Sequence, residues 1–192
     1  MQDNMKKNFL LILMSLPFFL SAQENMCRMN QFNENGEKEG LWVSKNSFYK
    51  TFEYFKNGKE NGFYYCINLH TNTLAFAGEK ADGKYVSLFC FSESGHIDFS
   101  FTNFQDNNLH VPKSQWAYMG DGIPKFKCVM TSYYPSGNKK KEGTLLCDDE
   151  PIIDSAQCGE WRYYDEQGFL SEVKIYGDTI KILHPGDEGW PE

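Results

Sequence analysis

Cysteines are the residues of this chain whose number and spacing most readily suggest chemistry. The six are Cys27, Cys66, Cys90, Cys128, Cys147 and Cys158. None belongs to a C-x-x-C pair, the spacing typical of zinc sites and redox motifs, so we expect no cysteine-based metal centre. Wide spacing and an even count favour disulfides in an exported protein, and we expect Cys147 and Cys158 to bridge one hairpin or loop. The pairing of the other four stays open, and several of the six could instead be buried thiols that pack as small hydrophobic groups.

Histidines and acidic residues give no local signature of a catalytic or metal site. No two of the four histidines lie two or four residues apart, the spacings that bring imidazoles together on a strand or a helix. The run Asp148-Asp149-Glu150 lacks the spacing of a known calcium loop, which favours a solvated turn. No phosphate loop, dinucleotide fingerprint or nucleophile elbow occurs. We therefore expect no enzyme activity, no metal and no cofactor; the enzymatic alternative is a glycan-acting enzyme with two carboxylates brought together by the fold.

The first residues have the features of a secretory signal peptide. Lys6 and Lys7 precede an apolar run from Phe9 to Leu20, and Ser21-Ala22 supply the small residues before a polar stretch. The run is shorter than the roughly 20 residues that span a membrane. We expect residues 1–22 to be removed, and the remainder to be secreted or periplasmic with no transmembrane segment.

The charge of the remaining chain excludes some partners. Residues 1–22 hold two of the 19 basic and one of the 26 acidic side chains, which leaves a net charge of −8. An acidic surface repels phosphate backbones, so no nucleic-acid partner is expected. The aromatic fraction of 16% indicates a folded chain with a packed core.

Glycines and aromatic residues recur along the chain at a nearly regular interval. The segment Asn35-Gly36-Glu37-Lys38-Glu39-Gly40-Leu41-Trp42 recurs 22 residues later as Asn57-Gly58-Lys59-Glu60-Asn61-Gly62-Phe63-Tyr64. Asn-Gly steps tolerate positive φ and reverse the chain, so each unit predicts a tight β-hairpin, and the second glycine leaves room for a ring or a neighbouring strand. A lone hairpin is marginal in water, so the copies must join edge to edge. The residues expected to form these turns and aromatic positions are Gly36, Gly40, Trp42, Gly58, Gly62, Tyr64, Gly83, Tyr85, Gly137, Gly159, Trp161 and Gly168.

These units resemble the MORN repeat, in particular the bacterial variant found in exported proteins and in proteins labelled as YwqK-type antitoxins. The resemblance covers roughly residues 33–100 and 131–176. It implies an all-β fold, an elongated antiparallel sheet of successive hairpins, of a kind that generally serves as a non-catalytic platform for proteins or membranes. Two features depart from the pattern: no aromatic residue follows Gly143 at the expected position, and residues 103–130 fit no unit.

The sequence thus predicts five parts: a signal peptide (1–22), an N-terminal hairpin array (23–102), a degenerate repeat or excursion (103–130), a C-terminal hairpin array (131–184) and a flexible tail (185–192). One sheet could run through all of them, or two arrays could be hinged near residues 103–130. Long irregular segments are often functional, so Trp116 and Tyr118 are candidate binding residues. The alternative is that their rings fill the core of a degenerate repeat.

Two functions from different classes agree with these features. The first is a non-catalytic binding or scaffold module of the bacterial envelope, whose sheet binds another protein or an envelope glycan. The second, suggested by the family label, is an antitoxin- or immunity-like partner that neutralises a toxin. An acidic surface would suit a basic partner of that kind.

Overall fold

The computed structural model describes residues 29–116, 124–148 and 155–191. The predicted signal peptide and Tyr118 lie outside these residues. Within them the chain is all-β, with one short 3-10 helix, η1 (Lys113–Gln115). The strands are β1 (Gln31–Phe32), β2 (Lys38–Lys45), β3 (Tyr49–Lys56), β4 (Lys59–Asn68), β5 (Thr73–Ala81), β6 (Lys84–Phe91), β7 (Ile97–Asp106), β8 (Phe126–Tyr133), β9 (Lys139–Cys147), β10 (Ser155–Tyr164), β11 (Leu170–Tyr176) and β12 (Ile180–Leu183).

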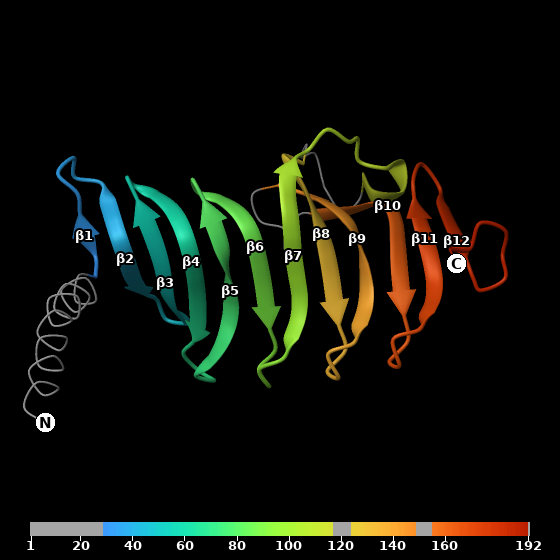
Figure 1. The fold of residues 1–192 in the computed structure, drawn as a ribbon, viewed down its shortest axis with the longest axis horizontal. Coiled ribbons are helices and arrows are strands. Elements are labelled where there is room, and N and C mark those ends of the chain that lie inside the picture. Colours follow the sequence, from blue (N-terminus) through green and yellow to red (C-terminus); the bar gives the residue numbers. More distant parts are fainter. Residues whose placement is uncertain (1–28, 117–123, 149–154, 192) are drawn as a thin grey trace, which may run out of the picture.

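All twelve strands form one open sheet in chain order, and each is antiparallel to the next (Figure 1). This confirms the predicted sheet of successive hairpins. The pairing of β7 with β8 crosses the interval where a hinge between two arrays was the alternative, so the described strands belong to a single sheet. The strands also reach into the predicted excursion, because β7 extends to Asp106 and β8 begins at Phe126.

Tight turns lie where the Asn-Gly pattern predicts them. Asn57 and Gly58 join β3 to β4 with φ of 49° and 76°, and Asp82 and Gly83 join β5 to β6 with φ of 50° and 80°. Two successive residues with positive φ characterise the two-residue turn whose twist matches that of the flanking strands. These turns therefore follow directly from the local sequence.

The glycines that precede the aromatic residues differ in role: a Cβ atom on Gly62 would lie 3.3 Å from Cβ of Tyr54, as the prediction of room for a ring requires, whereas Gly159 does not have this role. Tyr64 faces Gly78 of the neighbouring strand, and Trp161 faces Gly143. A Cβ atom on Gly143 would lie 2.4 Å from Cδ2 of Trp161, so only glycine leaves room for the indole. By contrast, a Cβ atom on Gly159, which precedes Trp161 by two residues, would have nothing within 4 Å, but this glycine has a φ of 66°. The Trp161 ring therefore covers a glycine on the adjacent strand.

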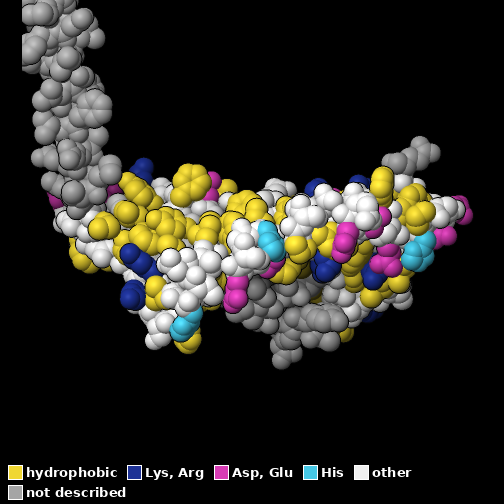
Figure 2. Space-filling view, turned by 90° about the horizontal axis from the view of Figure 1, so that it is seen from below, with side chains coloured by type: hydrophobic (Ala, Val, Ile, Leu, Met, Phe, Trp, Pro, Cys, Tyr) yellow, Lys and Arg dark blue, Asp and Glu magenta, His cyan; other side chains and the backbone are white. Residues whose placement is uncertain are grey.

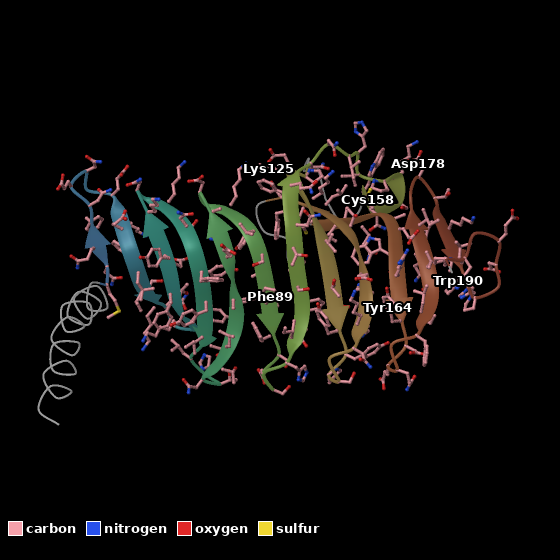
Figure 3. The ribbon with its side chains drawn as sticks, viewed as in Figure 1. Phe89, Lys125, Cys158, Tyr164, Asp178 and Trp190 are labelled. Carbon is pink, nitrogen blue, oxygen red and sulfur yellow. The ribbon has the colours of Figure 1, made fainter. Side chains whose placement is uncertain are left out.

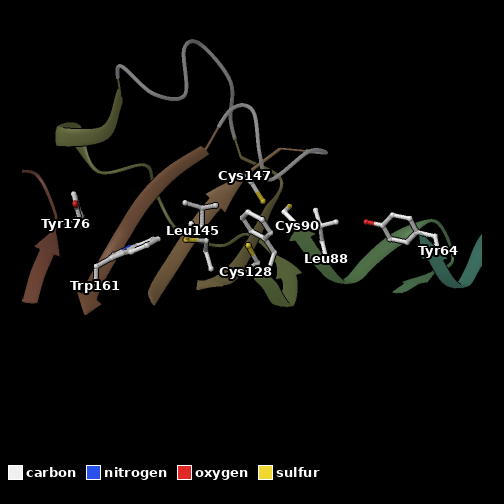
Figure 4. Close-up of a cluster of buried hydrophobic side chains, with 10 residues drawn as sticks. Tyr64, Leu88, Cys90, Cys128, Leu145, Cys147, Trp161 and Tyr176 are labelled. Carbon is white, nitrogen blue, oxygen red and sulfur yellow. The ribbon is translucent and has the colours of Figure 1, made fainter. Parts of the chain in front are cut away.

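Buried side chains gather on one face of the sheet, which we call the Trp161 face (Figure 4). Residues spaced by two along each strand share a face, and the register carries this face from strand to strand. The most completely buried side chains lie on β9, β10 and β11; Cys147 and Trp161 belong to this face, whereas Leu146 and Val173 are buried on the opposite face. The core on the Trp161 face comprises Tyr64, Leu88, Cys90, Phe101, Cys128, Met130, Leu145, Cys147, Trp161 and Tyr176.

The structure corrects the predicted disulfide, because Cys147 and Cys158 are free thiols. The register of β9 and β10 pairs Cys147 with Ser155 and Cys158 with Thr144. The two cysteines are thus an odd number of positions out of register, and alternation sends their side chains to opposite faces. Cys147 belongs to the core of the Trp161 face (Figure 4). Cys158, labelled in Figure 3, packs against the separate cluster of Leu146 and Ala156. A disulfide between the two cysteines would require the sulfur atoms to meet through the sheet.

The end of the described chain follows β12 through hydrogen-bonded turns. The backbone N–H of His184 donates to Oδ2 of Asp187 at 2.8 Å, and that of Trp190 donates to the Asp187 carbonyl at 3.1 Å. These bonds lie within or beside the predicted flexible tail. No helix in the described part of the chain has the length and apolar composition needed to cross a membrane.

Candidate functional site

A cavity of about 470 Å³ lies on the Trp161 face of the C-terminal half of the sheet. Five successive strands, β7 to β11, each contribute one buried side chain to its floor: Phe101, Met130, Leu145, Trp161 and Tyr176. The indole N–H of Trp161 donates to the Thr144 carbonyl at 3.0 Å, so this large ring is held in place by a hydrogen bond as well as by packing. The floor is apolar and built on paired strands, which makes it rigid.

The 3-10 helix η1 closes one end of the cavity. Ser114 Oγ donates to the Gly177 carbonyl at 2.8 Å, and Gln115 Oε1 accepts the backbone N–H of Gln157 at 3.3 Å. Gln115 is only 5% exposed, and its Nε2 donates to the Ser114 carbonyl at 3.1 Å. Pairing between β10 and β11 begins at Gly159, so the start of β10 extends beyond β11 and leaves an edge for η1. The segment after β7 therefore folds back onto strands far along the chain.

Lys141 is the charged side chain among the described residues that line the cavity. Its Nζ lies 5.6 Å from the centroid of the Trp161 ring, a cation–π distance. Burial lowers the pKa of Lys141, and the positive charges of Lys140 and Lys174 lower it further. Lys174 has a carboxylate partner, Glu172, at 3.1 Å, whereas no described carboxylate forms an ion pair with Lys141.

The lining does not assemble a catalytic constellation from the residues that the structure describes, which include no histidine or carboxylate at this cavity. Ser132 lies opposite Lys141 in the register of β8 and β9, the arrangement from which a serine–lysine pair could be built. However, the buried Ser132 hydroxyl has no hydrogen-bond partner, so the Lys141 amine does not act as its base.

Burial, followed by the negative charge of Asp98, raises the pKa of the Cys90 thiol to about 11, which keeps this sulfur protonated and weakly nucleophilic at neutral pH.

A second cavity, of about 910 Å³, lies over β5 to β8, but its charges are already neutralised. Lys80 pairs with Glu60 at 3.2 Å, and Lys84 pairs with Asp106 at 3.4 Å. The Lys80 amine also lies over the Tyr64 and Tyr85 rings at 5.3 and 4.9 Å. Lys80 therefore resembles Lys141 in its position over an aromatic ring, but it differs in forming an ion pair with a carboxylate. We take the Trp161 cavity as the candidate site because its charge lacks such a partner.

The residues predicted to bind a partner are not at this cavity. Trp116 follows η1, is 58% exposed and donates its indole N–H to the Val111 carbonyl at 3.1 Å, but it does not line the cavity. Tyr118 lies outside the described residues. Of the predicted turn and aromatic positions, only Trp161 contributes to the lining.

Sequence reasoning missed Lys141 and Gln115. The one signal for Lys141 was the basic run Lys139-Lys140-Lys141, but the register between β8 and β9 shifts at this run and breaks the alternation, so the sequence did not indicate which lysine would face Trp161. Nothing in the local sequence indicated that Gln115 would meet the backbone of Gln157.

No family model, no curated protein and no solved structure matches this chain. The resemblance to the MORN repeat therefore remains a prediction. The function must be argued from the cavity and its lining.

Proposed function

We propose that this chain is a non-catalytic, exported binding module that accepts an apolar group of a partner molecule in the Trp161 cavity. The observation that carries the proposal is the floor of five buried side chains from five successive strands, closed at one end by η1. A preformed apolar concavity of a few hundred Å³ is the usual form of a small-molecule site. Because the floor is already ordered, binding incurs little cost in conformational entropy.

The chemistry of the lining supports binding rather than catalysis. The polar groups on η1 form hydrogen bonds within the protein, and the Cys90 thiol is protonated. The sequence predicts a protein or an envelope glycan as partner. The apolar floor favours an acyl or aromatic group, since a sugar would leave its hydroxyls without hydrogen bonds there. Export is supported by the sequence of residues 1–22, which has the charged start and apolar run of a signal peptide.

Titration with a neutral, apolar fluorescent dye such as N-phenyl-1-naphthylamine tests this proposal. We expect saturable binding of one dye per chain. In the variant Ile180→Trp, the larger ring at the rim should obstruct the cavity and weaken dye binding at least tenfold, while the floor stays intact.

Ile182→Trp is the matched control for this test. Ile180 and Ile182 lie on the same strand and are 45% and 48% exposed, but only Ile180 lines the cavity. Non-saturable binding to the parent protein, or equal losses in the two variants, would contradict the proposal.

Exposed aromatic side chains on the opposite face support the second candidate, an antitoxin-like partner. Phe63 is 77% exposed, and the rings of Phe52 and Tyr65 stack with centroids 4.4 Å apart. Figure 2 shows hydrophobic side chains gathered over the N-terminal half of the molecule. Exposed aromatic residues are typical of the energetically important centres of protein interfaces. Under this alternative, a secreted basic protein encoded beside this chain forms a complex that Phe63→Ser weakens without affecting dye binding; the absence of a complex excludes it.

A further inference from the structure

Binding of a purely apolar group in the cavity does not explain the position of Lys141. Its amine is half-buried beside the Trp161 ring and has no carboxylate partner among the described residues. Withdrawing an ammonium group from water is unfavourable unless a negative charge compensates for it. The two lysines that line the second cavity have that compensation: Lys80 from Glu60 at 3.2 Å and Lys84 from Asp106 at 3.4 Å.

The cavity is also arranged with its charge at one end. Lys141 and Leu145 lie on the same face of β9, four residues and therefore roughly 13 Å apart. Between them Gly143 has no side chain, and the Trp161 ring covers this position. An elongated apolar floor thus leads from the ammonium group toward η1.

The polar groups at the η1 end do not require a second charge on a ligand. The Ser114 hydroxyl donates to the Gly177 carbonyl at 2.8 Å. The Gln115 side chain is hydrogen-bonded at both its oxygen and its nitrogen, to Gln157 and Ser114. Lys174, whose charge acts on Lys141, pairs with Glu172 at 3.1 Å. Among the described residues that line the cavity, the unpaired charge is therefore a single positive one.

We infer that the ligand of the Trp161 cavity is a single-chain amphiphile of the fatty-acid type, with its carboxylate at Lys141 and its hydrocarbon chain along the floor formed by Trp161 and Leu145. This inference rests on the proposed function and names its ligand class. The ligand carboxylate supplies the counter-charge that the described chain does not, and the chain displaces water from the apolar floor. One uncompensated lysine suits a monoanion.

Displacement of the neutral dye by decanoate and by decanol tests the inference, because the two probes share a chain and differ in the charge of the headgroup. At pH 7 and low salt we expect decanoate to bind about tenfold more tightly than decanol. Lys141→Gln should remove this preference, and Lys141→Arg should retain it because the guanidinium also pairs with a carboxylate.

The matched control is Lys181→Gln, which removes one positive charge from the neighbouring part of the sheet. Lys181 is exposed on β12, lies opposite Ile175 in the register and does not line the cavity. This variant should keep the preference for decanoate. An equal loss in Lys181→Gln and Lys141→Gln would show that overall charge, not Lys141, causes the preference, and would overturn the assignment.

The two proposals fail in different ways. If decanol and decanoate displace the dye equally well from the parent protein, the anionic headgroup is wrong while the apolar site stands. If neither displaces a dye that binds, or if no dye binds, the proposed apolar site itself is wrong.

Discussion

At the scale of single residues, Lys141 and Glu142 show how adjacent charges on one strand acquire different roles. Alternation places Lys141 over Trp161, whereas Glu142 lies on the opposite face, where it accepts a hydrogen bond from the Tyr164 hydroxyl at 2.6 Å and pairs with Lys139 at 2.7 Å. Burial alone would raise the pKa of Glu142, but the hydrogen bonds from Lys139 and Tyr164 outweigh it, and the net shift is downward. The same burial, with the hydrogen bond to Glu142, raises the pKa of Tyr164 to about 12.

The Glu142 carboxylate should therefore stabilise the fold in a pH-dependent way. Because its pKa is lower in the folded state, its contribution is present above the unfolded-state value of about 4.3 and is lost as the pH falls through the folded-state value. We expect Glu142→Gln to lower the free energy of unfolding by about 1 kcal/mol at pH 7 and by much less at pH 3. Urea denaturation at the two pH values measures the difference.

Glu160→Gln serves as the control, because both side chains of the Glu160–Arg162 ion pair, 2.8 Å apart, are exposed to solvent. Exposed pairs contribute little, so this change should have almost no effect at either pH. An effect of Glu142→Gln that persisted undiminished at pH 3 would rule out the charge of Glu142 as its source.

At the scale of elements, the contact between Trp161 and Gly143 joins β10 to β9. A fully buried indole lies directly on the backbone of the neighbouring strand, and Tyr64 does the same over Gly78 between β4 and β5. The ring in each case covers the position where a side chain would otherwise stand. In each pair of strands, a large ring on one strand packs on a glycine of the next. Trp161 also contributes to the floor of the cavity.

Gly143→Ala should consequently destabilise the protein. Its Cβ would lie 2.4 Å from Cδ2 of Trp161, too close for any pair of carbon atoms, so the indole or a strand must shift. Overpacking of this kind costs about 2 to 3 kcal/mol, which a chemical denaturation curve would detect.

Gly177→Ala is the comparison for this substitution. Gly177 lacks a positive φ, as Gly143 does, but a Cβ there would meet its nearest atom, the Thr179 carbonyl oxygen, at an ordinary 3.6 Å. Its effect should be within about 0.5 kcal/mol. Similar losses for the two variants would mean that contact with Trp161 is not the cause.

At the scale of the whole molecule, the sheet continues through the region where the sequence allowed a hinge. Phe101 of β7 and Met130 of β8 are direct partners in the register, and both belong to the core and to the floor of the cavity. The strands on either side of residues 107–125 are therefore held together by backbone hydrogen bonds and by shared apolar contacts.

Cleavage within residues 107–112 should leave the two parts of the chain associated. We expect the fragments to coelute in size-exclusion chromatography in native buffer and to separate only in denaturant, because the β7–β8 ladder and the Phe101–Met130 contact do not depend on the connecting chain. Two fragments that eluted separately in native buffer would instead indicate two independent arrays.

The local sequence determined the hairpins. Positive φ at Asn57-Gly58 and alternation along strands such as β7 are properties of a few neighbouring residues, so both could be predicted without knowing what lies across the sheet. The same reasoning located Trp161 and its preceding glycine. Where a short turn joins two strands, their pairing followed from the sequence as well, but the pairing of β7 with β8 across residues 107–125 did not.

The tertiary structure alone decided which side chains meet. A shift of one residue in the register moves every side chain of a strand to the other face, and this separates Cys147 from Cys158 although they lie close in the sequence. The contact of Lys141 with Trp161, and the docking of η1 on Gly177 and Gln157, join residues on different strands. Such contacts depend on register, bulges and strand ends, which are set by the packing of the whole sheet, and the candidate site is built from them.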